Sequence, residues 1–426
     1  MLSGPALELK SGVRLAIAPL PAVHRAAVAV HVQSGPRFEP GELVGISHFL
    51  EHMLHRGIPA HPTAHAQALA FEELGAELSA ATYADHTVLA TIGPPETVGA
   101  VIELLGEVCA SPLFSSIEIE RGIVREEILE STNDDGDLID PDDLLVDLAF
   151  PGHGLGRPIT GTLEALERFD LQALRRIHAE QYVGDGLFVT VAGAVSADEV
   201  AAKAAAGAFA RLPRGKRLVD RAPLALAGPH MGYRRDTTTQ TALRVAFRAP
   251  GRGDADEAAC ELLLRLLDDG MSTRLYTRVC DELGLAYDVT ASYEAFDGAG
   301  LLTLASECAH ARTPELLGEL LQIVARLRDE GPSEAEIEKA RRRATWQMRA
   351  MLDDPGEVAA FVGLAALAGR SSEIAKRLDE LSAVTRERAL AAAARVFDPK
   401  NLVLSVVGRQ SAAQRRALEA KLFEFR

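Results

Sequence analysis

The segment Tyr182-Val-Gly-Asp-Gly-Leu-Phe-Val-Thr-Val-Ala-Gly193 decides the fold of this 426-residue chain, because the chain contains it twice. The second copy is Phe397-Asp-Pro-Lys-Asn-Leu-Val-Leu-Ser-Val-Val-Gly408, which lies 215 residues downstream. Each copy predicts the end of a helix, a short turn and a buried strand, and a helix opened by Ser196 or Ser411 follows. A repeat of about half the chain length predicts two homologous halves.

The boundary between the halves is expected in a basic, proline-containing linker from Pro213 to Pro223. The predicted organisation is therefore an N-terminal half at 1–212, a linker at 213–223 and a C-terminal half at 224–426. With 47% hydrophobic and 25% charged residues, the chain can bury one or two full-sized cores.

One segment of the N-terminal half has the pattern of a metal site, namely His48-Phe-Leu-Glu51-His52 inside an apolar run at 43–56 that predicts a helix. At 3.6 residues per turn, the two imidazoles and the carboxylate share one face. Two neutral imidazoles are suitable ligands for Zn²⁺. The alternative is a pair of ordinary core or surface histidines.

A catalytic zinc site needs a third protein ligand and an open fourth position. The acid-rich segment 117–130 predicts a helix that could deliver it, with Ser115 or Ser116 as the cap. On this helix Glu120 and Glu127 are two turns apart and share a face, whereas Glu126 points about 100° away from Glu127.

These motifs together resemble the pitrilysin or insulinase-type metallopeptidases, the inverted zincins, a family that includes mitochondrial processing peptidase. The resemblance rests on the pentapeptide, on the two glutamates about 75 residues downstream, and on further matches along most of the chain. These matches are Gly35-Pro-Arg-Phe-Glu-Pro40, Pro151-Gly-His-Gly-Leu-Gly-Arg-Pro158 with Gly161-Thr162, Gly270-Met-Ser-Thr-Arg-Leu275 and Gly284-Leu-Ala-Tyr287.

The resemblance implies an α+β fold of two homologous halves, each a mainly antiparallel sheet packed with helices. It also implies one Zn²⁺ per chain held by His48, His52 and Glu127, with Glu51 as general base and Glu120 orienting the site. Zinc in such a site acidifies a bound water, and the glutamate can move that water's proton to a leaving amine. The expected reaction is hydrolysis of peptide bonds in short or unfolded peptides. His55, one turn beyond His52, is expected at the rim.

A strand pair around a turn near Asp85 is predicted between the metal helix and the third ligand. The resemblance implies that a substrate peptide adds as a strand to its first member, 78–82. The substrate-contacting residues would be Ser79, Ala80, Ala81 and Thr82. Ser79 and Ala81 replace an Asn and a Phe that are common in the family, which predicts a more open pocket. The alternative is an ordinary sheet edge.

The C-terminal half differs from the N-terminal half at the metal helix, and it departs from the family at a substrate-gripping arginine. The segment 259–270, which matches the metal helix, has Glu261, Leu264 and Arg265 in place of the zinc-site residues. Active members also carry an Arg seven residues before the Tyr that matches Tyr287, to grip the substrate, and this chain has Cys280 there. Arg274 and Arg278 do not match that position.

The missing arginine predicts a heterodimer with a homologous chain that carries the Arg/Tyr pair, and the alternative is a homodimer. A non-catalytic scaffold subunit is a further alternative, although such members normally lose the pentapeptide. Trimming the leader of a ribosomally made natural product is a role suggested by analogy alone.

Composition excludes several other classes. The net charge of −16 argues against nucleic acid or an anionic membrane as partner. No apolar run is long enough for a membrane span, and no secretory signal is visible. The four cysteines contain no C-x-x-C pair and are expected as reduced thiols of a cytoplasmic protein.

Overall fold

The chain forms two compact units in the computed structural model, which describes residues 6–133, 135–370 and 372–426. Unit 1 consists of Met1–Ile128, Arg157–Asp220 and Gln347–Lys376. Unit 2 consists of Leu129–Gly156, Arg221–Trp346 and Arg377–Arg426. Each unit therefore takes one segment from the other predicted half, and the boundaries at 1–212, 213–223 and 224–426 stay a prediction.

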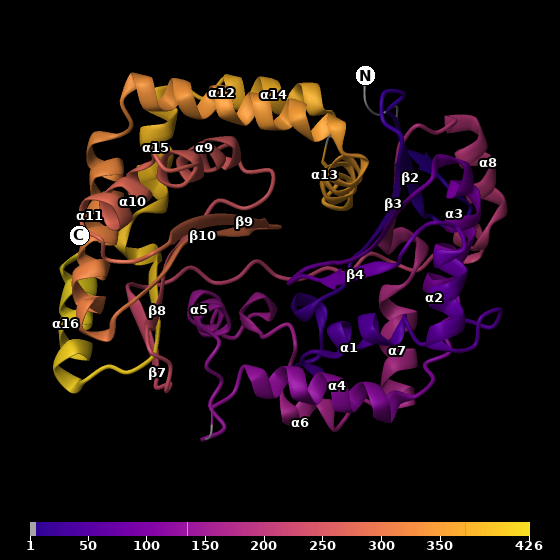
Figure 1. Cartoon of the computed structure of the whole chain (residues 1–426), viewed down its shortest axis with the longest axis horizontal. Helices are drawn as coiled ribbons and strands as arrows, with labels where there is room; N and C mark the ends of the chain where they lie inside the picture. The colour runs from indigo at the N-terminus through magenta and orange to yellow at the C-terminus, as the bar shows by residue number, and fades with distance from the viewer. Residues whose placement is uncertain (1–5, 134, 371) are drawn as a thin grey trace. The chain divides into compact units, whose positions relative to one another are not determined.

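Unit 1 contains a six-stranded sheet in the order β1-β2-β6-β3-β5-β4 (Figure 1). Every neighbouring pair is antiparallel except β2 and β6. The central strands β3 and β6 are buried along their whole length, as their nearly uninterrupted apolar sequences require. The strands are β1 Leu7–Glu8, β2 Arg14–Pro19, β3 Ala26–Val32, β4 Ser79–Thr82, β5 Thr87–Gly93 and β6 Leu187–Gly193.

Unit 2 contains a five-stranded sheet in the order β7-β11-β8-β10-β9, in which only β7 and β11 are parallel. Its strands are β7 His230–Arg234, β8 Thr241–Ala249, β9 Val289–Phe296, β10 Ala299–Cys308 and β11 Leu402–Val407. The pairing register repeats that of unit 1, since Ala27 lies opposite Ala192 and Ala242 lies opposite Val407. The predicted α+β fold of two homologous halves is confirmed, and the repeat extends to the strand register.

Helices cover both faces of the first sheet. One face packs on a large apolar cluster to which α1, α3 and α7 contribute, and the other face packs on α13 (Figure 1). The helices that lie in unit 1 wholly or for most of their length are α1 Ile46–Met53, α2 Ala64–Glu72, α3 Val98–Ala110, α4 Ile117–Glu130, α6 Leu163–Leu166, α7 Leu171–Gln181, α8 Ala197–Ala206 and α13 Pro355–Leu367.

The second sheet packs on α5 and on helices from the C-terminal half. The helices that lie in unit 2 wholly or for most of their length are α5 Pro141–Ala149, α9 Glu257–Leu267, α10 Arg274–Tyr276, α11 Thr313–Glu330, α12 Glu334–Ala350, α14 Ile374–Ser382, α15 Arg386–Val396 and α16 Ala412–Glu424. A π-helical turn, Thr277–Glu282, follows α10. None of the helices in the described ranges is long and apolar enough to cross a membrane. The four cysteines are not disulfide-bonded.

The helices α5 and α13 occupy matching positions in the two halves of the sequence, and each belongs to the unit built mainly by the other half. Both begin with an Asp-Pro pair, and the carboxylates of Asp140 and Asp354 each accept two amide hydrogens of the first turn. The helix α5, from the N-terminal half, packs on β8 and β11, and α13 packs on β3 and β6. A Cβ at Gly363 of α13 would lie 2.1 Å from the ring of His31, so this packing needs glycine.

Candidate metal centre

The position of the metal helix is set by the loop that precedes it. The helix α1 begins after Gly45, whose φ of 93° is costly for other residues and which has no side chain to cap the helix. The carboxylate of Glu39 accepts from the amides of Gly45 and Ser47, each at 2.8 Å, and so replaces the usual cap. Burial raises the pKa of Glu39 to about 7 despite these bonds.

The helix is shorter than the predicted 43–56 because its ends are set by the Gly45 conformation and by a turn after Met53. Phe49, Leu50 and Met53 are fully buried in the apolar cluster of unit 1. This packing fixes the rotation of the helix, and the opposite face carries the two histidines and Glu51.

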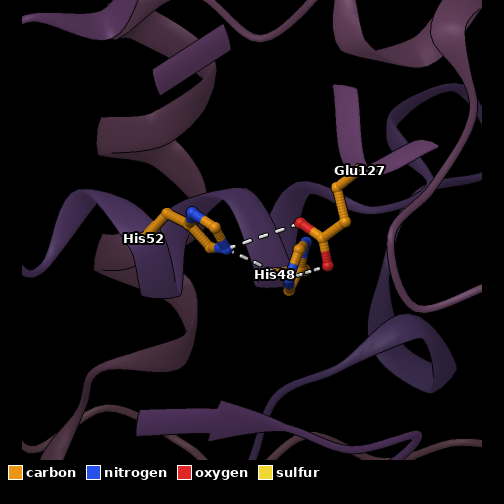
Figure 2. A group of neighbouring side chains, drawn as sticks. All are labelled: His48, His52 and Glu127. Carbon is orange, nitrogen blue, oxygen red and sulfur yellow. Dashed lines mark hydrogen bonds and ion pairs between the residues drawn. The ribbon is translucent and has the colours of Figure 1, made fainter. Parts of the chain in front are cut away.

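The structure brings the side chains of His48, His52 and Glu127 together, the first two from α1 and the third from α4 (Figure 2). The two Nε2 atoms are 3.2 Å apart. The Glu127 oxygens lie 3.5 Å from Nε2 of His48 and 3.8 Å from Nε2 of His52. In the described ranges this is the one group of three such ligand atoms close enough to hold a metal ion.

These distances fit zinc. Two donors at about 2.0–2.1 Å from a tetrahedral zinc are about 3.3 Å from each other. Burial lowers the pKa of His48 to about 3, so its imidazole is neutral and has a lone pair to offer. Two imidazole Nε2 atoms and a carboxylate facing one another are the donor set of a three-ligand zinc site with a free fourth position.

A second carboxylate fixes the orientation of His52. Oε1 of Glu120 lies 2.9 Å from Nδ1 of His52, and Oε2 of Glu120 accepts a hydrogen bond from the guanidinium of Arg56. Burial works against ionisation of Glu120, but the bonds from His52 and Arg56 outweigh it and lower the carboxyl's pKa. An ionised Glu120 accepts the Nδ1 hydrogen, which leaves the Nε2 lone pair of His52 free for a metal.

The net pKa of His52 is raised. Burial alone would lower it, but the hydrogen bond to Glu120 and the charges of Glu51, Glu120 and Glu127 raise it.

Sequence reasoning missed Arg56, which holds Glu120 in place. A signal was present, because Arg56 is one helical turn beyond His52 on the same stripe.

Glu51 is buried beside the two imidazoles and accepts a hydrogen bond of 3.2 Å from the hydroxyl of Thr82 on β4. Burial raises its pKa, while His52 and the Thr82 bond act in the opposite direction. A carboxylate with a raised pKa is a better proton acceptor, and it can later return the proton.

The strand β4 lies at the end of the sheet order and pairs with β5 alone among the described strands. The hydroxyl of Ser79 donates back to the carbonyl of Ala90 on β5, and Ala80, Ala81 and Thr82 are half-buried. The turn near Asp85 is confirmed, since Tyr83 donates its amide hydrogen to the carbonyl of His86. The helix α1 packs against this edge strand.

Other candidate residues lie outside the ligand group. Glu126 is exposed, and His55 is half-buried and does not belong to the group of three. In unit 2 the side chain of Tyr287 is 95% exposed and Cys280 is half-buried on the π-helical turn.

The two arginines near Cys280 are bound by carboxylates. Arg274 pairs with Glu336, and Arg278 pairs with Glu319 and Glu282. Each guanidinium is therefore already engaged within unit 2.

The helix of unit 2 that matches α1 is α9, and its polar face carries ion pairs. Glu261 pairs with Arg377, which is buried and also contacts Glu257 and Glu380. Arg265 pairs with Asp269. Within the described residues, no group of three metal-ligating side chains includes a residue of this helix.

Comparison with family models gives two adjacent matches. A model described as insulinase (peptidase family M16) matches residues 14–163, and one described as peptidase M16 inactive domain matches residues 168–344. The second match covers the part of the chain that contains α9.

Relatives in three bacteria match over most of the chain, and each is named an uncharacterized zinc protease. The protein from Mycobacterium bovis is 30% identical over 400 residues, covering 90% of this chain and 89% of the relative. The protein from Mycobacterium leprae is 29% identical, covering 92% and 89%. The protein from Bacillus subtilis is 26% identical, covering 91% and 94%.

Two solved structures have the same fold. One is described as the peptidase M16 inactive domain from Pseudomonas fluorescens, with a TM-score of 0.88, 19% identity and coverage of 97% of this chain and 99% of that chain. The other is a protease from Helicobacter pylori, with a TM-score of 0.86, 17% identity and coverage of 96% and 100%.

Proposed function

Because the chain belongs to peptidase family M16, the pitrilysin or insulinase-type metallopeptidases, we propose that it is the zinc-binding subunit of an endopeptidase that hydrolyses short or unfolded peptides. The observation that carries the proposal is the convergence of His48, His52 and Glu127 at 3.2–3.8 Å, with the Glu51 carboxylate beside them. The names of the relatives support zinc and protease chemistry in the family.

In this proposal, His48, His52 and Glu127 hold one zinc ion. When bound there, zinc supplies a Lewis acid and lowers the pKa of water. Glu120 keeps the Nδ1 hydrogen of His52 on the side away from the metal. Glu51 takes a proton from water at one carboxylate oxygen and returns it to the leaving amine, while Thr82 holds the other oxygen.

The edge strand β4 is the proposed binding place for the substrate backbone. An extended peptide added beside Ser79–Thr82 would gain main-chain hydrogen bonds with little sequence preference. The small side chains of Ser79, Ala80 and Ala81 leave room for bulky substrate residues. Thr82 would then connect the substrate strand with Glu51 through its hydroxyl.

The test of the proposal is Glu51→Gln, assayed with a quenched fluorogenic peptide library and with zinc analysis of the purified protein. We expect one zinc per chain in both proteins and a loss of hydrolysis of about 10²–10⁴-fold, the range for removal of a general acid–base group. The matched control is Glu126→Gln, which removes the charge of an exposed glutamate on α4 and should hydrolyse the peptides normally. Hydrolysis retained by Glu51→Gln would refute the role of this residue.

The proposed partner is a homologous chain that supplies the Arg/Tyr pair. Cys280 cannot replace a guanidinium, and Arg274 and Arg278 are held by carboxylates. We therefore expect weak hydrolysis by the zinc-loaded chain alone and a gain in Cys280→Arg. Full activity of the unaltered chain would instead support the homodimer, and absence of zinc would support the scaffold.

A further inference from the structure

Unit 2 contains a hollow of about 570 Å³ with an unusual concentration of arginines. Its walls come from the end of β7, the loop after β11 and the first turns of α16. We call it the arginine pocket, after Arg235, Arg409 and Arg415; the other lining residues that matter here are Tyr233, Ser411 and Gln414.

The arginines of the pocket have no ion-pair partner among the residues that the structure describes. The acidic residue next in sequence, Asp236, uses its carboxylate to accept from the amides of Thr237 and Thr238. In a chain with 61 acidic and 45 basic residues, three such arginines around one hollow are unexpected.

Two of the three guanidinium groups are nevertheless held in position. Arg409 donates a hydrogen bond of 2.6 Å to the carbonyl of Thr237. The guanidinium carbon of Arg415 lies 5.0 Å from the centre of the Tyr233 ring. These contacts orient the groups without neutralising them, and they leave most of the N–H donors of each fork free.

The internal repeat shows that the fold does not require these arginines. The positions 215 residues upstream of Arg235, Arg409 and Arg415 are Leu20, Ala194 and Val200. The strand register around them is the same in both units. The arginine cluster is therefore a property of the second unit alone, and its three exposed guanidinium groups are available to a ligand.

Its chemistry suits a phosphate group. Arginine forks bind phosphate oxygens through paired, charge-assisted hydrogen bonds, and three of them match a multiply charged tetrahedral anion better than a single carboxylate. The positive end of the α16 dipole lies at Ser411 and adds to the potential. A neighbouring hollow shares Tyr233 and Arg415 but includes Glu419, whose charge opposes an anion.

We propose that the arginine pocket binds the phosphate group of a small anion, either free phosphate or a phosphate ester. The volume of about 570 Å³ has room for an ester group beyond the phosphate. This site belongs to unit 2 and shares no residue with the metal centre, so the proposal is independent of the proposed peptidase activity.

The test is calorimetric titration of the full chain with inorganic phosphate and with AMP, at constant ionic strength set by chloride. We expect saturable binding of at least one of the two, and tighter binding of AMP would identify an ester as the ligand. Arg409→Gln and Arg235→Gln should each weaken binding by about tenfold or more. Arg326→Gln, an exposed arginine of α11 that does not line the pocket, is the control and should bind normally.

Three outcomes would overturn the proposal: no saturable binding of either anion, equal weakening by Arg326→Gln, and equally tight binding of citrate, which would indicate attraction to any anion. Arg235 is exposed, so its substitution should leave thermal unfolding without ligand unchanged. A loss of binding in Arg235→Gln therefore cannot be attributed to misfolding. The titration needs no peptide hydrolysis, and its result is separate from that of Glu51→Gln.

Discussion

The sharpest test of the metal centre compares two neighbouring glutamates on α4. Glu127 faces the two imidazoles, at 3.5 Å and 3.8 Å, while Glu126 is exposed. Glu127→Gln and Glu126→Gln remove the same charge from adjacent positions, so general electrostatic effects on a bound cation are similar. The difference between the two variants isolates the ligand contact.

The expected magnitude follows from the arrangement of the site. Loss of a group that only orients a ligand costs about 10–100-fold in metal affinity, and this is what we expect for Glu120→Gln. Loss of Glu127 leaves two imidazoles as the only protein ligands, so its cost should exceed about 100-fold, or about 2.7 kcal/mol. Glu126→Gln should change zinc affinity by less than about twofold.

Zinc affinity can be measured by competition with a chromophoric chelator, with zinc content by mass spectrometry as a second readout. The apolar core under α1 is untouched by Glu126→Gln and Glu127→Gln, so thermal unfolding of these two zinc-free proteins should agree. Equal zinc affinities for Glu126→Gln and Glu127→Gln would contradict the proposed ligand set.

Three further predictions concern the framework that holds the site. Glu39→Ala removes the acceptor of two amide hydrogens at the start of α1 and should lower the free energy of unfolding by about 1–2 kcal/mol in urea titration. Gly363→Ala places a Cβ against His31 and should cost about 1–3 kcal/mol in the same titration, whereas Gly122→Ala, where a Cβ meets nothing within 4 Å, should be neutral or stabilising. Burial, with the charges of two acidic neighbours, raises the pKa of Asp143 to about 7. Because the folded state then binds this proton more tightly than the unfolded state, stability should rise as the pH falls from about 8 to 5. Asp143→Asn should be more stable at pH 8 by about 1–3 kcal/mol and show a smaller rise, since Glu39, whose pKa is also raised to about 7, still contributes.

Much of the candidate site could be predicted because it depends on local helical geometry. The spacing of His48, Glu51 and His52 determines that they share a face, and the structure places them so. The seven-residue spacing of Glu120 and Glu127 works in the same way, and the predicted helix 117–130 agrees with α4. The repeat at a constant offset likewise predicted two halves of one fold, and the strand pairing of the two units agrees with it.

The parts that could not be predicted depend on contacts distant in sequence. The role of Glu39 as a cap is visible only once the loop has turned back on α1. The helix α13 is apolar on most sides, so its sequence does not say which sheet it covers. The structure assigns it to the first sheet through an apolar cluster with β2, β3 and β6 and through the close fit of Gly363 against His31.

The matched helices α1 and α9 show two solutions to the same physical problem, which is how to balance charge on a partly buried helix face. In unit 2 the carboxylates of Glu257, Glu261 and Glu380 converge on the guanidinium of Arg377. In unit 1 the carboxylates of Glu51, Glu120 and Glu127 converge with one guanidinium, that of Arg56. The imidazoles of His48 and His52, which can be neutral, occupy the place of a second cationic side chain. The number of charges is therefore similar on the two faces, and the difference lies in the imidazoles of His48 and His52, whose Nε2 atoms face the Glu127 carboxylate. Imidazole nitrogens are ligands for zinc and a guanidinium is not, which supports the proposal that zinc binds in unit 1 rather than in unit 2.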